Sequence, residues 1–589
     1  MRQPDQEFTN HAMLVLWGQF AQQIDLIEAL ETVTLHQKRR DHRPQTKVIE
    51  FLVAILAGFP HLKDISHSAH PLDRDHAVAR AWGQSAWANY SGVSRTFSAM
   101  SMTEARQIVQ VLDDISHPFI TEEINRALLQ ADNLQWDVDL TGRPVSNGST
   151  TYPNTAYGYM GGNVQLGYQA AMVSMHSPTY RRLWLSTTPH PGDTVSCMQA
   201  EASILTAETK SGVRPRRRTE LLAQRLAQAQ EQVHNAHLRW QNTQDRLQQV
   251  QQQLVETETQ IALCQEQIAA LESEYQKRNR PERPHSKLAQ ARRRLGVQQR
   301  RRERRLQAIP NAQRQIDKKW MVLQETQAYV LMLKQRLQRF EQENATNPKP
   351  LPITLRMDAG FGSGENIALL IEMGYDLYTK PQNHWVTTKI LEAIGENTEW
   401  ERVGRNAEMT VCTQRTIPNC PYPMDIALER FHTGSRIQNS ALLHYGSHPV
   451  TDDLSDWFQT YNSRQTIEAG IKEGKGVFQM HHFKVRSEAG LFLQEHFAAF
   501  AANFVRWAMR DLAVQSACLP DDTRQPTLSG VKALVQVAAH TSAWVVWQSH
   551  GCLLRFTDYS IFAGQSFQVG ERWFQLPLPL FKSYDFAPT

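Results

Sequence analysis

The chain has 589 residues, of which 41% are hydrophobic and 21% charged, and its formal net charge is +4 at pH 7. A chain of this length is too long for one hydrophobic core, so we expect several domains of an ordinary globular protein. The composition excludes a protein that is basic throughout, and the lack of an apolar run of ~18 residues excludes a membrane-spanning helix.

The first part of the chain, residues 1–130, has the three- and four-residue spacing of apolar side chains that is typical of helices. The clearest helices are predicted at residues 20–30 and 48–56, and Ser91 is expected to cap another short helix. A basic run, residues 36–43, lies between the first two. We therefore predict an N-terminal helical domain, which either binds DNA or is a plain helical domain.

Residues 134–141 alternate between apolar and polar side chains, as a strand does when one of its faces is buried. Asp137 and Asp139 share the polar face. Two carboxylates this close repel each other and lose solvent, and a bound cation makes such a pair tolerable. The strand is therefore a candidate for a site that binds a metal ion.

Two more strands are predicted at residues 169–176 and 182–186, followed by a helix for which Asp193 is the N-cap. Three strands and then a helix is how an RNase H-like core begins. We assign residues 131–215 to the first part of an α/β core.

Residues 216–348 follow a different pattern. Positions 222–275 keep an unbroken 4-3 spacing of apolar and small side chains, and positions 288–340 continue it after a Pro-containing turn at 280–286. Two arms of about 55–60 residues predict an antiparallel coiled-coil hairpin ~80 Å long. Pro310 is expected to kink the returning arm.

Basic charge is concentrated at the predicted tip of this hairpin. Residues 277–306 contain 13 Lys or Arg and two acidic residues, a local charge of +11, so the remainder of the chain carries −7. This density favours contact with DNA phosphates, and the alternative is a solvated face. The arginines assigned to DNA are Arg292, Arg293, Arg294, Arg300, Arg301 and Arg302.

The second part of the core is assigned to residues 349–515. Residues 352–358 form another alternating strand, with Asp358 at its end before a Gly-rich turn and a helix that Ser363 caps. An acidic residue in this position is a frequent catalytic feature of α/β folds. Residues 395–447 alternate weakly and contain several prolines, so we expect an irregular β insertion there.

Four side chains that can take part in binding or catalysis follow that insertion. If residues 461–475 form one helix, Tyr461, Arg464, Glu468 and Lys475 point within an arc of ~60°. One carboxylate, two cations and a phenol would then share a face. A solvated surface face is the alternative, although Glu468 has no lysine at the i+4 position.

We predict no further candidate site residues in the rest of the chain. Residues 489–509 are strongly apolar and predict a helix that packs in the core. The C-terminal region, residues 516–589, is expected to contain a helix and then short strands rich in aromatic residues, and we assign it no function.

The spacing Y-x2-R-x3-E-x6-K at 461–475 resembles the signature around the third acidic residue of DDE transposases of the IS4 superfamily. The flanks 457–458 and 476–478 look most like its IS1380-like branch. Asp139-x-Thr141 and Arg356-x-Asp358-x-Gly360 resemble the family's first and second acidic motifs. The resemblance covers roughly residues 130–200 and 350–510 and does not include the hairpin.

The resemblance implies an RNase H-like core in which Asp139, Asp358 and Glu468 are catalytic and bind two Mg²⁺ ions, for which Mn²⁺ can substitute. It also implies that Tyr461, Arg464, Lys472 and Lys475 bind DNA phosphates, and that Asp137 and Thr141 support the first acidic residue. Such an enzyme frees a 3′-OH at the ends of an insertion sequence and joins it to target DNA, with or without a DNA hairpin intermediate.

The expected partners are double-stranded DNA, namely the terminal inverted repeats and the target, and a second copy of the chain in a homodimer on DNA. The scattered cysteines suit reduced cytosolic thiols. The resemblance implies a bacterial cytoplasmic protein that is associated with the nucleoid when it is bound to DNA. One alternative is an inactive or repurposed DNA-binding protein derived from a transposase. Another is a coiled-coil ATPase of the SMC or Rad50 kind, whose phosphate-binding G-x4-G-K-[ST] loop the sequence lacks.

Overall fold

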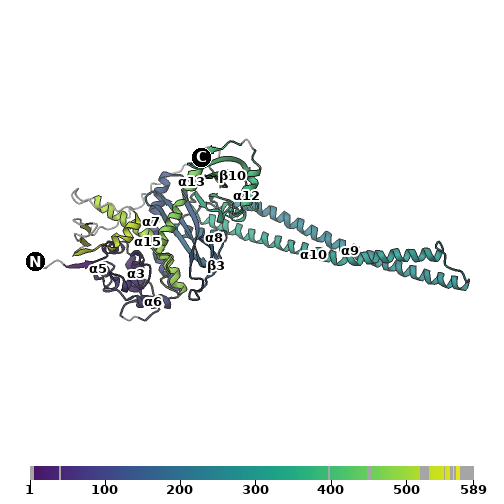
Figure 1. Cartoon of the computed structure of the whole chain (residues 1–589), viewed down its shortest axis with the longest axis horizontal. Helices are drawn as coiled ribbons and strands as arrows, with labels where there is room; N and C mark the ends of the chain where they lie inside the picture. The colour runs from purple at the N-terminus through teal and green to yellow at the C-terminus, as the bar shows by residue number, and fades with distance from the viewer. Residues whose placement is uncertain are drawn as a thin grey trace. The chain divides into compact units, whose positions relative to one another are not determined.

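The computed structural model describes residues 5–38, 41–395, 398–447, 453–517, 530–549, 551–556, 562 and 566–570. The chain divides into two compact units, residues 1–216 with 349–589, and residues 217–348. The first unit is mixed α/β, as predicted, and the second consists of two long helices (Figure 1). None of the helices in the described ranges is both long and apolar enough to cross a bilayer.

The N-terminal part of the first unit is mainly helical. Its α-helices are α1 (Ala12–Gln23), α2 (Leu26–Thr32), α3 (Pro44–Leu56), α4 (Asp64–His67), α5 (His76–Ala81), α6 (Tyr90–Ala99) and α7 (Met102–Gln130). The helix predicted at 20–30 is wrong, because Asp25, with φ of 57°, separates α1 from α2. The cap predicted at Ser91 is also wrong, since the Asn89 side chain accepts from the amide of Gly92 at 2.8 Å.

A small sheet joins the two ends of this unit. Its order is β1-β12-β13-β14, from β1 (Gln6–Thr9), β12 (Ala543–Gln548), β13 (Gly551–Phe556) and β14 (Ser566–Gly570). The N-terminal region that was predicted as helical therefore also contains a strand, and residues 6–9 pair with the C-terminal region. A four-residue strand is too short to show alternation, and its pairing partner lies more than 500 residues away.

The main sheet has the order β3-β4-β2-β6-β7-β11-β10-β9-β8, and β5 pairs with β4 outside this path. Its central strands are β2 (Leu134–Pro144), β3 (Ala156–Met160), β4 (Asn163–Ser177), β5 (Arg181–Pro191), β6 (Ile353–Met357) and β7 (Asp376–Thr379). Strands β4 and β5 extend β2 in an antiparallel manner, while β2, β6 and β7 are parallel.

Helices cover this sheet and connect its strands. They include α8 (Ser196–Ser211), α11 (Gly364–Glu372), α12 (His384–Glu392) and α15 (Glu488–Ala517). Helices α8 and α15 pack on β5, and α7 packs on α15 (Figure 1). The cap predicted at Asp193 is wrong, because α8 begins after Val195 and no side chain caps it.

The β insertion is more regular than predicted. Its strands are β8 (Glu401–Arg402), β9 (Ala407–Arg415), β10 (Met424–Thr433) and β11 (Arg436–Tyr445). They form antiparallel pairs, and β11 also pairs with β7 through Leu443 and Thr379. The insertion therefore continues the central sheet. Its strands are regular because they pair with one another and with β7, and the local sequence pattern does not predict this pairing.

Residues 461–475 do not form the single helix that the spacing predicted. The helices are α13 (Leu454–Asn462) and α14 (Gln465–Gly476), and the break falls at Ser463 and Arg464. Helix α14 packs closely on β5, where Arg182 donates to the carbonyl of Thr466. A Cβ atom on Gly470 would meet the Arg182 guanidinium and would lie 2.7 Å from Cζ2 of Trp184. Glycine is therefore required there for close packing.

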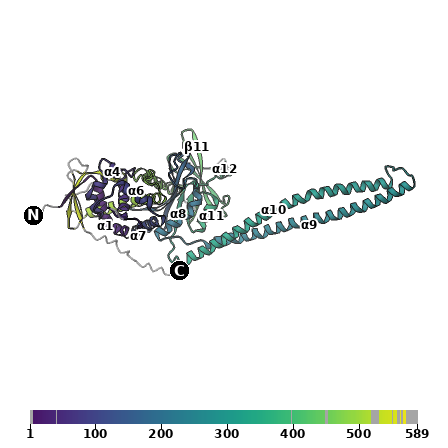
Figure 2. The same ribbon diagram turned by 90° about the horizontal axis from the view of Figure 1, so that it is seen from below.

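The second unit contains α9 (Thr219–Lys277) and α10 (Lys287–Ala345), which lie side by side in both views (Figures 1 and 2). They are antiparallel, because Arg225 near the start of α9 donates to Tyr329 near the end of α10 at 2.7 Å. Farther along, the rings of Trp240 and Trp320 lie 5.0 Å apart. Helix α10 continues through Pro310.

We predict that Gly470→Ala destabilises the first unit by ~1–3 kcal/mol, because the added methyl group overpacks the contact between α14 and β5. The matched control is Gly476→Ala in the same helix, where a Cβ meets nothing within 4 Å. The control should leave stability unchanged or raise it, since alanine favours helix more than glycine does. Urea unfolding measures both, and equal midpoints would contradict the packing argument.

Candidate active site

The first two acidic residues of the resemblance lie on neighbouring strands. In the parallel pair β2–β6, Val138 is opposite Met357, so Asp139 and Asp358 both follow directly after this pair. Asp358 stands at the end of β6, where its side chain accepts a hydrogen bond from the amide of Gly360 at 2.9 Å. Residues 219 positions apart in the sequence are thus brought to one edge of the sheet.

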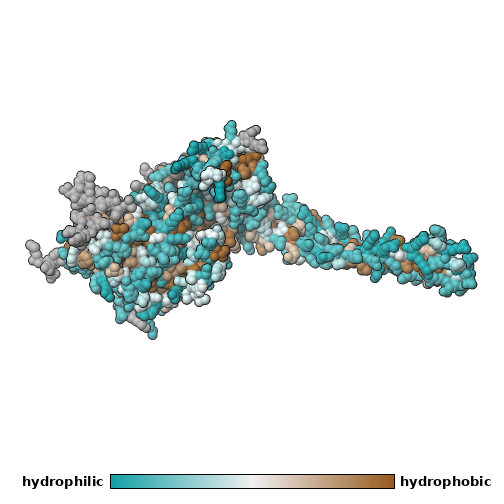
Figure 3. Space-filling model, viewed as in Figure 1, coloured by the Kyte–Doolittle hydropathy of each residue, from teal (hydrophilic) through white to brown (hydrophobic). Residues whose placement is uncertain are grey.

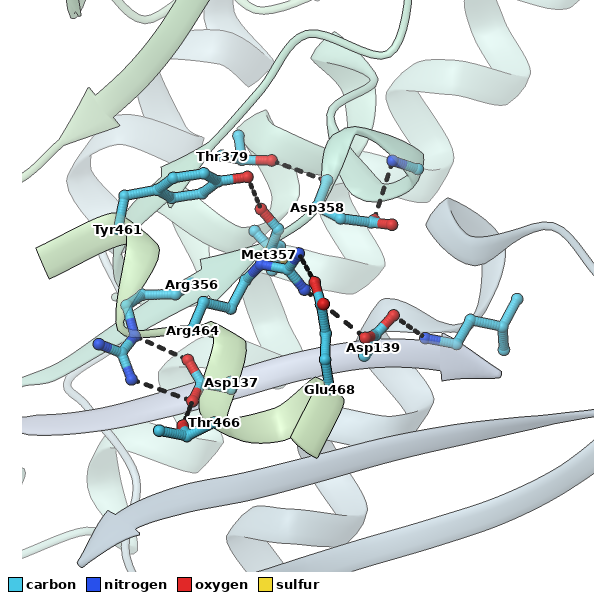
Figure 4. Close-up of polar contacts among 12 residues, drawn as sticks. Asp137, Asp139, Arg356, Met357, Asp358, Thr379, Tyr461, Arg464, Thr466 and Glu468 are labelled. Carbon is cyan, nitrogen blue, oxygen red and sulfur yellow. Dashed lines mark hydrogen bonds and ion pairs between the residues drawn. The ribbon is translucent and has the colours of Figure 1, made fainter. Parts of the chain in front are cut away.

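Arg464 connects these residues to Glu468. Its guanidinium lies 2.8 Å from Oε1 of Glu468 and 3.5 Å from Oδ2 of Asp139. Figure 4 shows these side chains pointing toward one another from α14 and β2. The break before α14 turns Arg464 inward, and its side chain is only 13% exposed, whereas that of Glu468 is 43% exposed.

The site carries more negative than positive charge. Burial and the nearby carboxylate of Asp358 raise the pKa of Asp139 to about 7, although Arg464 acts against this rise. Burial also raises the pKa of Asp358, and Arg464 again opposes the shift. Three carboxylates thus share one guanidinium, and a further cation would relieve their repulsion.

Asp137, two residues before Asp139, has a different environment. Its carboxylate accepts two hydrogen bonds from Arg356, at 2.7 and 2.9 Å, and both side chains are almost fully buried. Arg356 also donates to the carbonyl of Thr460 at 2.9 Å and to the hydroxyl of Ser463, and Thr466 donates to Asp137 at 3.3 Å. This ion pair fastens the α13–α14 junction to β2 and β6.

Arg356 and Thr466 had no assigned role in the sequence analysis. The sequence did contain a pattern that indicates the role of Arg356. Asp137 and Arg356 each stand two residues before an acidic motif residue, and they are opposite each other in the β2–β6 register. A charged pair at matching positions of two apolar strands indicates a buried ion pair. The role of Thr466 could not be predicted from the sequence, since its contact with Asp137 depends on how α14 packs against the sheet.

The predicted phosphate-binding residues are placed differently from one another. Tyr461 is buried, and its hydroxyl donates to the carbonyl of Met357 at 3.3 Å, so it supports the strand that ends at Asp358. Lys475 donates to the carbonyl of Gly142 at 2.8 Å, close to the end of β2. Lys472 is exposed, and Thr141 is buried in β2.

The arginines of the hairpin tip fall into two groups. Arg292 pairs with Glu272 and Glu282, and Arg302 pairs with Glu258, so these two link the α9 and α10 segments. For the other four, the structure shows no ion pair within the described chain, and all are exposed: Arg293, Arg294, Arg300 and Arg301. Those four are the better candidates for contact with an anionic partner.

The predicted metal ligands, Asp139, Asp358 and Glu468, are all carboxylates. Carboxylate oxygens suit Mg²⁺. However, in the part of the chain that the structure describes, no group of three or more His, Cys, Asp or Glu side chains is arranged to hold a metal ion. Arg464 is paired with Asp139 and Glu468, so it would have to move away before all three carboxylates could hold a metal ion.

We predict that Asp137→Asn lowers the stability of the first unit by about 3 kcal/mol, because it leaves the buried Arg356 without its countercharge. The matched control is Asp139→Asn, on the same strand and two residues away. It removes a carboxylate that its neighbours repel, so stability should stay the same or rise. Urea unfolding at pH 8 compares the two, and an equal loss in both would refute the distinction.

Comparisons with known proteins add little to the description of this site. No protein-family model matches the sequence, and no curated protein matches it. Among solved structures, the chain is similar to a piggyBac transposase in a synaptic complex with hairpin DNA, at a TM-score of 0.31 and 8% sequence identity, over 89% of this chain and 85% of that one. A TM-score of this size does not establish a shared fold.

Proposed function

We propose that the chain is a DDE transposase of the IS4 superfamily, nearest to the IS1380-like branch, with an RNase H-like core. The resemblance of its three acidic motifs is one support. The order of the elements is another, since antiparallel strands β2, β4 and β5 lead into α8 and then into β6 and β7, parallel to β2. Three strands followed by a helix is how the RNase H-like core that the resemblance implies begins.

The observation that carries the proposal is the meeting of the motif residues. Asp139, Asp358 and Glu468 are separated by 219 and 110 positions in the sequence. In the fold, the first two end up beside each other on parallel strands, and Arg464 links Glu468 to Asp139. Carboxylates of a buried structural network would be neutralised, as Asp137 is, whereas these three are left with excess negative charge.

The reaction we propose is cleavage of DNA at transposon ends and transfer of the freed 3′-OH to target DNA. Two Mg²⁺ or Mn²⁺ ions at the three carboxylates would supply charge neutralisation and an activated attacking oxygen. The proposal requires that Arg464 leave Asp139 and Glu468. A DNA phosphate is a suitable new partner for its guanidinium, because the planar fork binds two oxygens.

A second candidate function is that of a transposase-derived protein that binds DNA without cutting it. The ion pairs of Arg464 favour it, because they offset part of the negative charge of Asp139 and Glu468 without a metal ion. The two candidates make the same prediction for DNA binding and opposite predictions for cleavage. Assays on DNA that carries the inverted repeats flanking the gene therefore separate them.

We predict that the wild type nicks this DNA with Mg²⁺ or Mn²⁺ and not with EDTA. Asp139→Ala and Asp358→Asn should abolish single-turnover cleavage and keep DNA binding, while Asp137→Ala lowers the rate ~10–100-fold through lost positioning. Cleavage by Asp358→Asn at the wild-type rate would refute the assignment. DNA binding by a wild type that never nicks would favour the second candidate, and ATP hydrolysis would favour the coiled-coil ATPase.

We also propose that the hairpin tip contacts DNA phosphates. Replacing Arg293, Arg294, Arg300 and Arg301 by Gln should reduce the slope of log affinity against log salt by up to ~0.9 for each lost contact. The matched control removes four charges from the other half of α10, at Arg314, Lys318, Lys319 and Lys334. An equal reduction in both variants would show a general charge effect and contradict a contact at the tip.

A further inference from the structure

Lys484 is a buried lysine that no carboxylate contacts. Most of the surface in Figure 3 is hydrophilic, and lysines normally belong to such a surface, because they are rarely buried unless they are paired. Lys484 is only 8% exposed. Its ammonium group donates to the carbonyl of Gln479 at 3.5 Å and forms no ion pair within the described chain. Such a charge is costly, and an anionic ligand would offset the cost.

The loop that contains this lysine, residues 477–487 between α14 and α15, is fastened to the end of β2. Two guanidinium nitrogens of Arg143, in β2, donate to the carbonyl of Met480 at 3.0 and 2.8 Å. Lys475, near the end of α14, donates to the carbonyl of Gly142 at 2.8 Å. Gly142 lies three residues after the first acidic residue of the candidate active site, so the loop adjoins that site.

Histidines add to the basic groups of this loop. The rings of His481 and His482 lie 4.0 Å apart, and the ring of His61 lies 5.5 Å from that of His482. His481 is exposed, so the cluster reaches the surface there. Arg143 differs from the two lysines, because it forms a buried ion pair with Glu495.

The basic groups repel one another. Burial and then the charge of Arg143 lower the pKa of Lys484 to about 7, although Asp64 opposes this shift. Burial and Arg143 also lower the pKa of Lys475. The Asp64 carboxylate accepts a hydrogen bond from the amide of His61 at 2.8 Å and acts on Lys484 only from a distance. An anion would relieve this repulsion, as a cation would among the neighbouring carboxylates.

We propose that the α14–α15 loop binds a phosphate group through Lys484, with Lys475, His481 and His482 as the surrounding basic groups. A compact ammonium group suits a phosphate oxygen as a point charge. The phosphate can belong to a DNA backbone or be a free ion, because both present the same oxygens. The DNA source rests on the proposed function, since a strand held at the carboxylates would pass this loop, whereas the phosphate site itself does not.

The first test compares thermal unfolding of the full chain in inorganic phosphate and in chloride at equal ionic strength. The gain in midpoint from phosphate should be ~2–4 °C larger for the wild type than for Lys484→Met. In chloride, Lys484→Met should be at least as stable as the wild type, because it removes a buried cation from among like charges. The matched control, Arg486→Gln, changes an exposed charge of the same loop and should respond to phosphate like the wild type.

The second test identifies the source of the phosphate. In DNA that carries the inverted repeats, neutral methylphosphonates replace one backbone phosphate at a time around the cleavage position. Replacement of the contacted phosphate should weaken wild-type binding about tenfold, as expected for the loss of one charged hydrogen bond, and should leave the binding of Lys484→Met unchanged. Arg486→Gln should respond to that replacement like the wild type.

A position with this difference assigns the site to a DNA phosphate. Stabilisation by phosphate that depends on Lys484, without such a position, supports the site and assigns it to a free phosphate. Equal responses of the wild type and Lys484→Met to phosphate and to every methylphosphonate would overturn the proposal. A loss of stability of Lys484→Met in chloride would also overturn it, by showing that this lysine stabilises the fold. A chain that binds phosphate but never nicks DNA would count against the proposed function alone.

Discussion

The buried pair of Arg356 and Asp137 is the interaction on which the candidate site depends. A charged pair that is shielded from solvent is tolerated only when its hydrogen bonds are satisfied, and here each guanidinium nitrogen of Arg356 donates to a backbone or side-chain acceptor. The pair joins β2 to β6 and also holds the α13–α14 junction. It adds little net stability, but it fixes one register and one docking position for α14.

That register determines where the acidic residues meet. Side chains of a strand alternate between faces, so Asp139 and Asp358 follow the ion pair at the next positions toward the strand ends. A shift of one residue between β2 and β6 would turn one carboxylate to the opposite face. The same network anchors the turn that directs Arg464 inward. The excess of carboxylates over cations in the site therefore depends on the register and the docking position that the buried Arg356–Asp137 pair fixes.

The sequence predicted the features that depend on local pattern. Alternation identified β2 and β6 around Asp139 and Asp358, and heptad spacing identified the stretches that form α9 and α10. Features that depend on distant pairing were missed, such as β1 and the regularity of β8–β11. The break at Ser463 was missed because helical spacing continues across it, and only the contacts of Ser463 and Thr466 with the Arg356–Asp137 pair show why the chain turns there.

The hairpin also has features that its sequence pattern does not predict. A heptad pattern locates the seam between two helices, but it does not count the apolar residues that remain outside that seam. Likewise, a charge count does not distinguish Arg292 and Arg302, which hold the helices together, from the four arginines that face solvent. The charge count therefore predicts where the hairpin is basic, and the ion pairs decide which of those arginines are available to an anionic partner.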